Sequence, residues 1–527
     1  MIARRTLLAG TAAGLAAPAL AQGEAARTLR FIPQADVTVL DPLQTTSYAV
    51  RNHGHLCWDT LYGLDADFRP QPQLAEGHEV AEDGRRWTFT LRAGLRFHDG
   101  EPIRAADAVA SIRRWMARDT HGQTLAARLQ AMQALDDRRF ELRLSRPFGV
   151  LLDALAKFSA YPCFVMPERF AALPPTTALT EIVGSGPYRF VAAERRAGDR
   201  VVYQRFDQYV PTPAGTPAVT AGPKLAQFER VEWRIIGDGA TAGAALQAGE
   251  VDWWENITPD LRPLLARRRD VVLDRLSRHG LVAMLRPNHL HPPFDDPAAR
   301  RALLPALSQA DFMQALFGDD RSRWRDGLGC FPIGSALASD AGLAALTAPR
   351  DMAAARAALA ATGRAGQKVV MLHPADQQVN SALTLVANDL LTRMGFAVED
   401  ATSDWGTMLQ RRARMEPPGQ GGWNAVVAIF GGEDLLNPGG HPLLRANGRG
   451  AWFGWPDSPA LEALRDEWFD APDLPAQQAI GARIQSRFLE DLPYWPLGQY
   501  QVDTAYRRGL VIGRRGLTLP LNVRREA

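Results

Sequence analysis

Cysteine is scarce in this sequence, with 3 cysteines among 527 residues. Cys57, Cys163 and Cys330 cannot all pair within one chain, so at most one intrachain disulfide can form. The fold must therefore depend mainly on packing, and the chain is long enough to build two or more hydrophobic cores.

The sequence also lacks a strong net charge and, beyond its start, long apolar runs. Its formal net charge is +2 at pH 7, and removal of Arg4 and Arg5 with an N-terminal leader would bring it to 0. Such a balance creates no overall field that would attract nucleic acid or an anionic membrane, so we expect no nucleic-acid partner. After residue 21 no apolar stretch of about 18 residues follows, so nothing further predicts a membrane span.

The motifs of common catalytic sites are missing too. There is no G-x-S-x-G, no H-E-x-x-H, no G-x-x-x-x-G-K and no G-x-G-x-x-G after a predicted strand. Two pairs, His53/His55 and His289/His291, could bind a metal if each lay on one face of a strand, but neither has a Cys or carboxylate partner at ligand spacing. We therefore expect no metal, no cofactor and no enzyme.

The first 21 residues, MIARRTLLAGTAAGLAAPALA, have a recognisable pattern. A basic start at Arg4-Arg5, an apolar run over residues 7–15 and small residues over 19–21 precede Gln22. This order is typical of a cleavable export signal. The adjacent arginines favour the twin-arginine route, while general secretion stays open. We expect the mature protein to begin at Gln22 and to be soluble outside the cytoplasm.

Short strand-like segments alternate with helical ones along most of the chain. Residues 87–91 and 140–144 alternate apolar and polar side chains with the period of a strand. Residues 105–116 and 459–469 carry apolar side chains at helical spacing. The pattern predicts a mixed α/β fold.

Aromatic side chains stand beside glycine and acidic residues in several predicted loops. Such rings provide large, rigid contact surfaces. Each cluster alone could belong to the core, but three of them at strand ends favour a binding cleft. The clusters are Asp252-Trp253-Trp254-Glu255, Asp404-Trp405-Gly406 and Phe430-Gly431-Gly432-Glu433-Asp434.

Several longer motifs, taken in order, resemble the extracellular solute-binding proteins of peptide-type ABC transporters, the dipeptide- and oligopeptide-binding family. The resemblance covers residues 28–527. It rests on LAEGHEVAEDGRRWTFTLRAGLRFHDGEPIRAADAVASIRRW, GSGPYRF, ALQAGEVD, HPPFDDPAARRALLPAL, ARAALAATG, DLLTRMGFAVE and GGWNAVVAIFGGED. Within the first motif, His98 and Asp99 could suggest an acid/base pair, but a His-Asp-Gly turn needs only local hydrogen bonds, so we predict a structural role.

The resemblance implies an α/β fold like that of the type II periplasmic-binding proteins, with two lobes joined by a two-crossing hinge. On this pattern, residues 1–21 are the leader and residues 22–278 form lobe I, with an extra subdomain at about 60–183. Residues 279–497 form lobe II, and residues 498–527 return to lobe I. The crossings are expected near 278–285 and 494–500, and the ligand is trapped between the lobes.

The resemblance also implies site residues. In dipeptide binders of this family, an acid after an aromatic-glycine step pairs with the ligand's ammonium, and the matching residue here is Glu433, with Phe430 before it and Asp434 beside it. An Arg-Pro step grips the ligand carboxylate in those proteins, but here it is His373-Pro374. Histidine cannot offer the two-pronged fork of a guanidinium.

Three further residues are expected at the cleft on the same grounds. Tyr48 matches a loop of lobe I that faces the ligand. Trp405 matches a position that either lines the pocket or braces the hinge, and Trp254, at the end of a predicted strand, either lines the pocket or belongs to the core.

These expectations define a non-catalytic periplasmic receptor, acting as a monomer. It would deliver a peptide or peptide-like small organic solute to the permease of an ABC importer in the inner membrane. The alternative is a secreted hydrolase acting on peptides or glycosides. That alternative requires a pair of carboxylates or an activated nucleophile in the cleft. The only candidates are Glu433 and Asp434, which are adjacent in the sequence.

Overall fold

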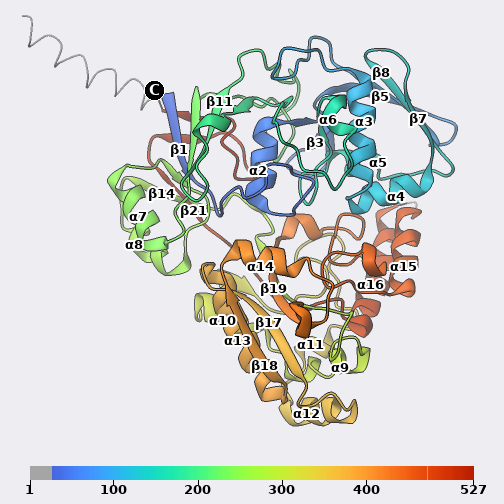
Figure 1. Cartoon of the computed structure of the whole chain (residues 1–527), viewed down its shortest axis with the longest axis vertical. Helices are drawn as coiled ribbons and strands as arrows, with labels where there is room; N and C mark the ends of the chain where they lie inside the picture. Colours follow the sequence, from blue (N-terminus) through green and yellow to red (C-terminus); the bar gives the residue numbers. More distant parts are fainter. Residues whose placement is uncertain (1–26, 472, 527) are drawn as a thin grey trace, which may run out of the picture.

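A computed structural model describes residues 27–471 and 473–526. Figure 1 shows two bodies, one above the other, with the N-terminal half and the last strands above and most of residues 281–500 below. The leader predicted over residues 1–21 lies outside the described residues. Among the helices that are described, none is both long and apolar enough to cross a membrane.

Lobe I is organised around a mixed sheet. Strand β1 pairs in parallel with β12 and β13, whereas β11, β21 and β14 run antiparallel to their neighbours. In spatial order the described strands are β10 (Tyr188–Phe190), β11 (Arg200–Arg205), β12 (Arg230–Arg234), β1 (Thr28–Ile32), β13 (Trp253–Trp254), β21 (Thr504–Arg507) and β14 (Val271–Asp274).

The helices and short strand pairs of lobe I surround this sheet. Helix α2 lies next to the boundary between the lobes (Figure 1). The helices are α2 (Tyr48–Cys57), α5 (Leu151–Ala156), α6 (Glu168–Ala171), α7 (Gly239–Ala248) and α8 (Arg262–Ala266). The short strand pairs are β2 (Asp59–Thr60) with β9 (Phe164–Val165), β3 (Tyr62–Leu64) with β4 (Pro70–Pro72), and β22 (Leu510–Ile512) with β23 (Val523–Arg525).

A separate antiparallel sheet forms the extra subdomain of lobe I. Strand β6 follows the predicted alternation, because its inward side chains are buried and the others are half-buried, whereas in β8 the outward Glu141 is buried as well. The predicted helix at 105–116 is confirmed with the same bounds as α3. The elements are β5 (Ala75–Ala81), β6 (Arg86–Leu91), β8 (Arg139–Leu144), β7 (Leu129–Ala134), α3 (Ala105–Met116) and α4 (Thr120–Arg128).

Lobe II has its own mixed sheet. Strand β17 pairs in parallel with β18 and β19, and β15 pairs antiparallel with β19 and β20. The described strands, in spatial order, are β16 (Trp324–Arg325), β20 (Trp495–Tyr500), β15 (Leu281–Pro287), β19 (Ala425–Gly431), β17 (Lys368–Pro374) and β18 (Ala397–Ser403).

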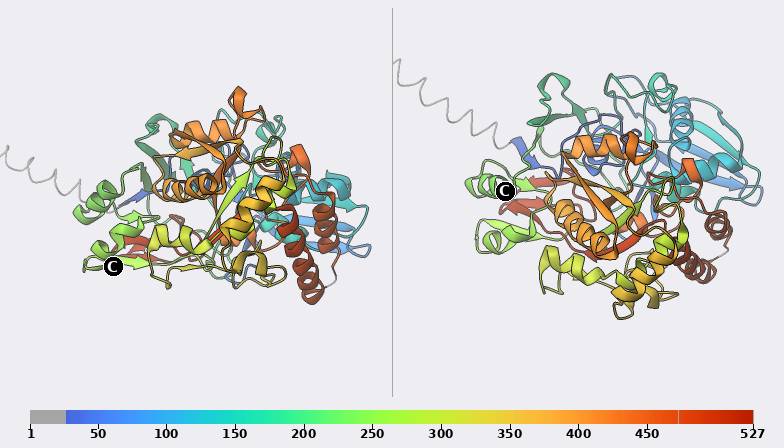
Figure 2. Two further views of the ribbon diagram at one scale, coloured as in Figure 1. Left: turned by 90° about the horizontal axis from the view of Figure 1, so that it is seen from below. Right: turned by 60° about the horizontal axis from the view of Figure 1, so that its bottom comes forward.

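Helices cover this second sheet, as the two views of Figure 2 show. The predicted helix at 459–469 is confirmed as α15, which begins at Pro459 after a cap in which Ser458 accepts a hydrogen bond from the amide of Leu461. The helices are α9 (Pro297–Arg301), α10 (Gln309–Phe317), α11 (Ala344–Thr347), α12 (Met352–Ala361), α13 (Gln378–Met394), α14 (Trp405–Arg412), α15 (Pro459–Phe469) and α16 (Leu474–Asp491).

The chain crosses between the lobes twice within the described residues. The first crossing is residues 275–280, between β14 and β15, and the second is residues 501–503, between β20 and β21. The predicted second crossing at 494–500 lies almost entirely inside β20, because every side chain of that strand is buried in lobe II. Charge returns only after the strand, at Asp503, which binds Arg262, Arg275 and Arg323.

His98 has the structural role that the sequence predicts. Its Nδ1 accepts a hydrogen bond from the amide of Gly184, and its Nε2 donates to the carbonyl oxygen of Gly186. Burial lowers the pKa of His98 to about 4, so the ring is neutral at physiological pH. Asp99 instead binds Arg169 on the surface. The two side chains therefore do not form a catalytic pair.

Gly184 is required by the close approach of two backbone segments. A Cβ atom at this position would lie 1.7 Å from the carbonyl oxygen of Cys57. We expect Gly184→Ala to destabilise the protein by about 3 kcal/mol or more, because the backbone would have to separate. Gly149→Ala is the matched control, since a Cβ atom there meets no neighbour within 4 Å. Denaturant unfolding measures both, and equal stability of the two variants would contradict this packing.

Candidate ligand site between the lobes

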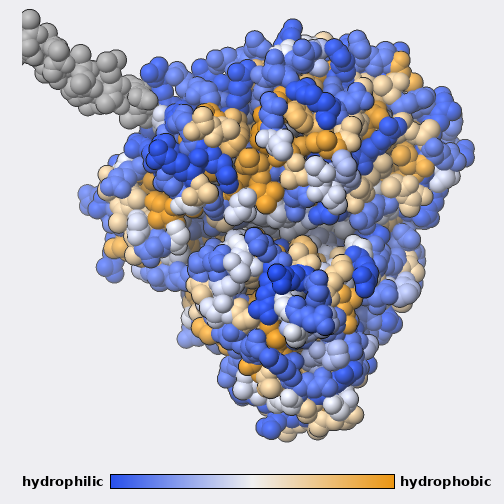
Figure 3. Space-filling model, viewed as in Figure 1, coloured by the Kyte–Doolittle hydropathy of each residue, from blue (hydrophilic) through white to orange (hydrophobic). Residues whose placement is uncertain are grey.

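The two sheets point their strand ends at one another across the boundary between the lobes. Residues 33–35 follow β1 and Trp254 ends β13, while residues 376–380 follow β17 and Phe430 lies near the end of β19. All of these residues line one cavity of about 240 Å³. The carboxyl ends of parallel strands are the usual position of ligand sites in α/β proteins. Figure 3 shows the furrow between the lobes on the outer surface, with apolar side chains on the upper lobe beside it.

Four of the predicted site residues meet at this cavity, which is called the larger cavity below because a smaller one adjoins it. Tyr48 and Trp254 reach it from lobe I, and Trp405 and Phe430 from lobe II. The Tyr48 and Phe430 rings lie edge to face, with centroids 6.4 Å apart. Trp405, at the start of α14, is half-buried, whereas Trp254 is 4% exposed and also packs into the core of lobe I. Trp254 therefore both lines the cavity and packs into the core, which were the two alternatives for this residue.

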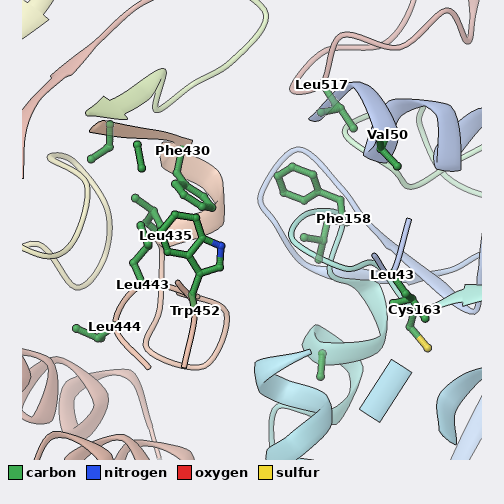
Figure 4. Close-up of a cluster of buried hydrophobic side chains, with 14 of the residues drawn as sticks. Leu43, Val50, Phe158, Cys163, Phe430, Leu435, Leu443, Leu444, Trp452 and Leu517 are labelled. Atoms are coloured by element: carbon green, nitrogen blue, oxygen red, sulfur yellow. The ribbon is translucent and has the colours of Figure 1, made fainter. Parts of the chain in front are cut away.

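Phe430 is held in place by an apolar cluster of lobe II. Its ring lies edge to face on Trp452, with centroids 5.6 Å apart. Figure 4 shows Phe430 and Trp452 side by side, with Leu435 and Leu443 next to them. Because this support is buried, the cavity-facing edge of the ring is fixed before any ligand arrives.

A smaller cavity of about 80 Å³ adjoins the larger one and shares with it the wall residues Gln34, Tyr48, Asn256, Leu281 and Val502. The predicted acids Glu433 and Asp434 both line this smaller cavity rather than the larger one. Both acids were predicted as ligand contacts, but in the structure they have different hydrogen-bond partners.

Asp434 is buried at the contact between the lobes. Its Oδ2 accepts a hydrogen bond from the Tyr48 hydroxyl, which in turn accepts one from the amide of Gly431. Its Oδ1 is buried and has no hydrogen-bond partner among the described residues. Burial raises the pKa of Asp434, although the positive charge of Arg51 opposes that shift. The carboxylate is therefore poised to accept a hydrogen bond from a cationic group.

Glu433 is already occupied by the hinge. Its Oε1 accepts hydrogen bonds from the hydroxyl of Ser277 at 2.8 Å and from the amides of Arg278 and His279 at 2.9 Å each. These donors belong to the first crossing. Burial alone would raise the pKa of Glu433, but the hydrogen bonds from His279 and Ser277 outweigh it and lower that pKa.

His373 lines neither of these cavities. Its Nδ1 lies 2.9 Å from both carboxylate oxygens of Asp400, and its Nε2 lies 2.7 Å from the hydroxyl of Ser381. The ring therefore has a partner on each nitrogen, and its role as a ligand contact stays a prediction without geometric support here.

Four charged residues of the site were not predicted as ligand contacts, although Glu255 stood in one of the aromatic clusters. Glu255 follows Trp254 and lines the smaller cavity, where burial raises its pKa to about 7. Arg51 lies over the Tyr48 ring, with its guanidinium carbon 4.2 Å from the ring centroid. The others are Asp376 and Arg412, both on the wall of the larger cavity. The helical repeat from Trp405 was the available signal for Arg412, seven residues farther along the same helix.

The geometry of the His53/His55 pair does not suit a metal site, and His289 and His291 contact the carbonyl oxygens of Pro493 and Met415. His53 and His55 lie in a helix, not a strand, so their side chains diverge, with His53 bound to the Tyr203 hydroxyl and His55 to the carbonyl oxygen of Phe158. No group of three or more His, Cys, Asp or Glu side chains in the described residues could hold a metal ion. The three cysteines are buried and unpaired.

This architecture, two α/β lobes with a cavity between facing strand ends and two crossings at one side, defines a solute-binding protein. The sequence model of the bacterial extracellular solute-binding proteins, family 5, matches residues 69–428. The chain belongs to this family.

Individual proteins of known sequence or structure match nearly the whole chain. A probable peptide ABC transporter periplasmic-binding protein of Sinorhizobium fredii is 34% identical over 529 residues, covering 99% of this chain and 98% of the relative. A periplasmic binding protein solved with agropinic acid, from A. tumefaciens R10, superposes with a TM-score of 0.80 at 21% identity, covering 95% of this chain and 99% of the other. The Helicobacter pylori protein DppA, solved with a peptide, superposes with a TM-score of 0.78 at 19% identity, covering 95% of this chain and 98% of the other.

Family membership decides between the two classes that the sequence left open. The family consists of receptors of ABC transporters, not of enzymes, so the chain is a solute-binding receptor and the hydrolase is set aside.

Proposed function

We propose that this protein is an exported, monomeric receptor that binds a small peptide or a peptide-like solute with a free ammonium group and delivers it to an ABC importer permease in the inner membrane. The observation that carries the proposal is the pair of adjoining cavities between the lobes, one walled by aromatic rings and one lined by buried acids. The full-length relative named as a peptide-transporter component supports the same solute class.

The size of the cavity favours a small solute. At about 240 Å³ it is smaller than the roughly 300–1,000 Å³ of pockets for drug-sized ligands. A dipeptide, or a compound of similar bulk, fits this range better than a long peptide. The rings of Tyr48, Trp254, Trp405 and Phe430 would cover its apolar parts.

The ammonium group of the solute would bind in the smaller cavity. A buried cation needs a compensating charge, since an unpaired one costs several kcal/mol. Asp434 is the better partner of the two predicted acids, because its Oδ1 is unsatisfied while Glu433 serves the hinge. Closure of the lobes around the solute would follow from its higher affinity for the closed state.

A thermal-shift screen of the purified protein, residues 22–527, tests this function. Dipeptides and tripeptides are compared with amino-acid derivatives, sugars and metal chelates. A ligand at 100 times its dissociation constant stabilises the folded state by about 2.7 kcal/mol if it does not bind the unfolded chain. We expect short peptides or peptide-like amines to produce the largest shifts. Stabilisation by sugars alone would contradict the solute class, and product detected by mass spectrometry would restore the hydrolase.

Export is the cellular part of the proposal. If the twin-arginine route carries the folded protein out, replacing Arg4 and Arg5 with Lys should leave the protein in the cytoplasm, because that route requires the arginine pair. Cell fractionation and the N-terminal sequence of the exported form give the readout, with Gln22 expected as the first residue. Normal export of the Lys variant would contradict the twin-arginine route and leave the export signal itself in place.

A further inference from the structure

One charged group at the larger cavity, Arg412, has no counter-charge among the residues that the structure describes. Arg412 is the last residue of α14, and Figure 1 shows this helix at the edge of lobe II that faces lobe I. The residue is 7% exposed and its side chain lines the cavity. Trp405 and Leu409, seven and three residues before Arg412 in the same helix, line the same cavity, so one face of α14 forms this wall.

The guanidinium of Arg412 forms no hydrogen bond or ion pair within the described residues, and its Nε is buried without a partner. It rests on two rings, with its central carbon 4.8 Å from the Trp452 centroid and 4.7 Å from that of Phe453. These contacts fix its position but supply no negative charge. Burial lowers its pKa to about 10, so it stays charged at neutral pH.

The other charged groups on this wall do not neutralise it. Arg323 is paired with Asp503 through its Nη1 at 2.7 Å. Asp376 lies on an exposed turn, and no ion pair joins it to Arg412. The acids Glu255, Glu433 and Asp434 line the smaller cavity instead. Among the described residues, the larger cavity therefore has one buried cation without a counter-charge, and the buried acids line the smaller cavity together with Arg51.

We infer that Arg412 binds a carboxylate of the solute and that the protein selects solutes with a negative group at the end opposite the ammonium. A planar guanidinium offers two parallel donors that match a carboxylate, and a buried cation without a partner is costly, so a ligand anion both fits and relieves it. The inference rests on the proposed function, and it assigns the anion to α14 rather than to His373, which Asp400 and Ser381 already hold.

Calorimetry with paired peptides tests the assignment. Ala-X dipeptides are titrated as free acids and as their C-terminal amides into the wild-type protein, Arg412→Gln and Arg412→Lys. We expect the wild type to prefer the acids by about 30-fold or more, because breaking a buried charge pair costs several kcal/mol. Arg412→Gln should bind both forms equally weakly, and Arg412→Lys should recover part of the preference. Arg414→Gln, which removes an exposed charge two residues away, should change nothing.

Each outcome decides something. Amides that bind the wild type as well as the acids do, or an acid preference that survives in Arg412→Gln, would overturn the assignment while leaving the receptor function intact. If no dipeptide of either kind binds, the proposed solute class fails. The role of Arg412 is then tested in the unliganded protein by its melting temperature. Arg412→Met should then melt at the same or a higher temperature than the wild type, because an unpaired buried charge is removed. A clearly lower melting temperature would make Arg412 a structural residue and overturn the inference.

Discussion

Asp434→Ala is expected to weaken the binding of a peptide with a free amino terminus by about 30-fold to several thousand-fold. The carboxylate is buried where the lobes meet, with one oxygen bound to Tyr48 and the other without a partner in the described residues. A ligand ammonium enclosed there would lose the acid with an oxygen still open to it, because Glu433, on the same cavity, is bound to the first crossing. The loss of stability in the unliganded protein should be smaller, because the gain from removing a buried acid, whose pKa is raised by burial, offsets part of the lost hydrogen bond from Tyr48.

The same reasoning gives a pH dependence. The pKa of Asp434 is raised by burial, so the carboxylate takes up a proton at a higher pH than an ordinary aspartate does. Affinity for the ammonium should fall as the pH drops through this raised value, because the protonated acid carries no charge. Asp434→Asn should abolish that dependence along with most of the affinity.

Calorimetry over a range of pH measures both effects, with Asp376→Ala as the matched control. Asp376 is an acid on the wall of the larger cavity, but it is exposed and therefore screened by water. Its removal should change affinity only slightly. A large loss in Asp376→Ala together with unchanged binding in Asp434→Ala would show that the ammonium lies in the larger cavity.

Glu433→Ala is expected to act on folding, lowering the free energy of unfolding by about 2 to 4 kcal/mol. Three donors of the first crossing would lose their common acceptor, namely the Ser277 hydroxyl and the amides of Arg278 and His279. Glu433→Gln should cost less, because an amide oxygen can still accept these hydrogen bonds. Denaturant unfolding without ligand measures both variants.

The sign of the pH effect distinguishes this role. Because the pKa of Glu433 is lowered in the folded protein, its ionised form contributes stability above the unfolded value, about 4.3, and loses it as the pH falls through the folded value. The stability difference between the wild type and Glu433→Gln should therefore shrink in acid. If Glu433→Ala weakens peptide binding and leaves unfolding unchanged, Glu433 is the ligand's partner, as the family pattern alone suggests.

Local sequence patterns predicted helices and strands of this fold well where one face of the element is buried and the other is exposed to solvent. The helices at 105–116 and 459–469 have the predicted bounds, because their apolar side chains recur at helical spacing and their ends carry capping signals. The return crossing was harder to place. Residues 495–500 are buried on both sides, so they show no alternation that distinguishes a sheet strand from a linker.

The site was predictable only in part, because sequence patterns identify residue types but not their partners. Four aromatic residues of the larger cavity could be named from their positions at strand and helix ends. The difference between Glu433 and Asp434 could not, since it depends on Ser277 and Tyr48, which are more than 150 residues away in the chain. Arg412 was not predicted as a site residue for the same reason, because its lack of a counter-charge is visible only in three dimensions.

The central claim is that one solute molecule binds, unchanged, between the lobes. A crystal structure of the protein with the dipeptide of highest affinity tests it most directly. We expect one intact molecule in the larger cavity, between Trp254 and Phe430, with its ammonium at Asp434 and its carboxylate at Arg412. A dipeptide bound outside the boundary between the lobes, or found there as cleaved products, would contradict the account.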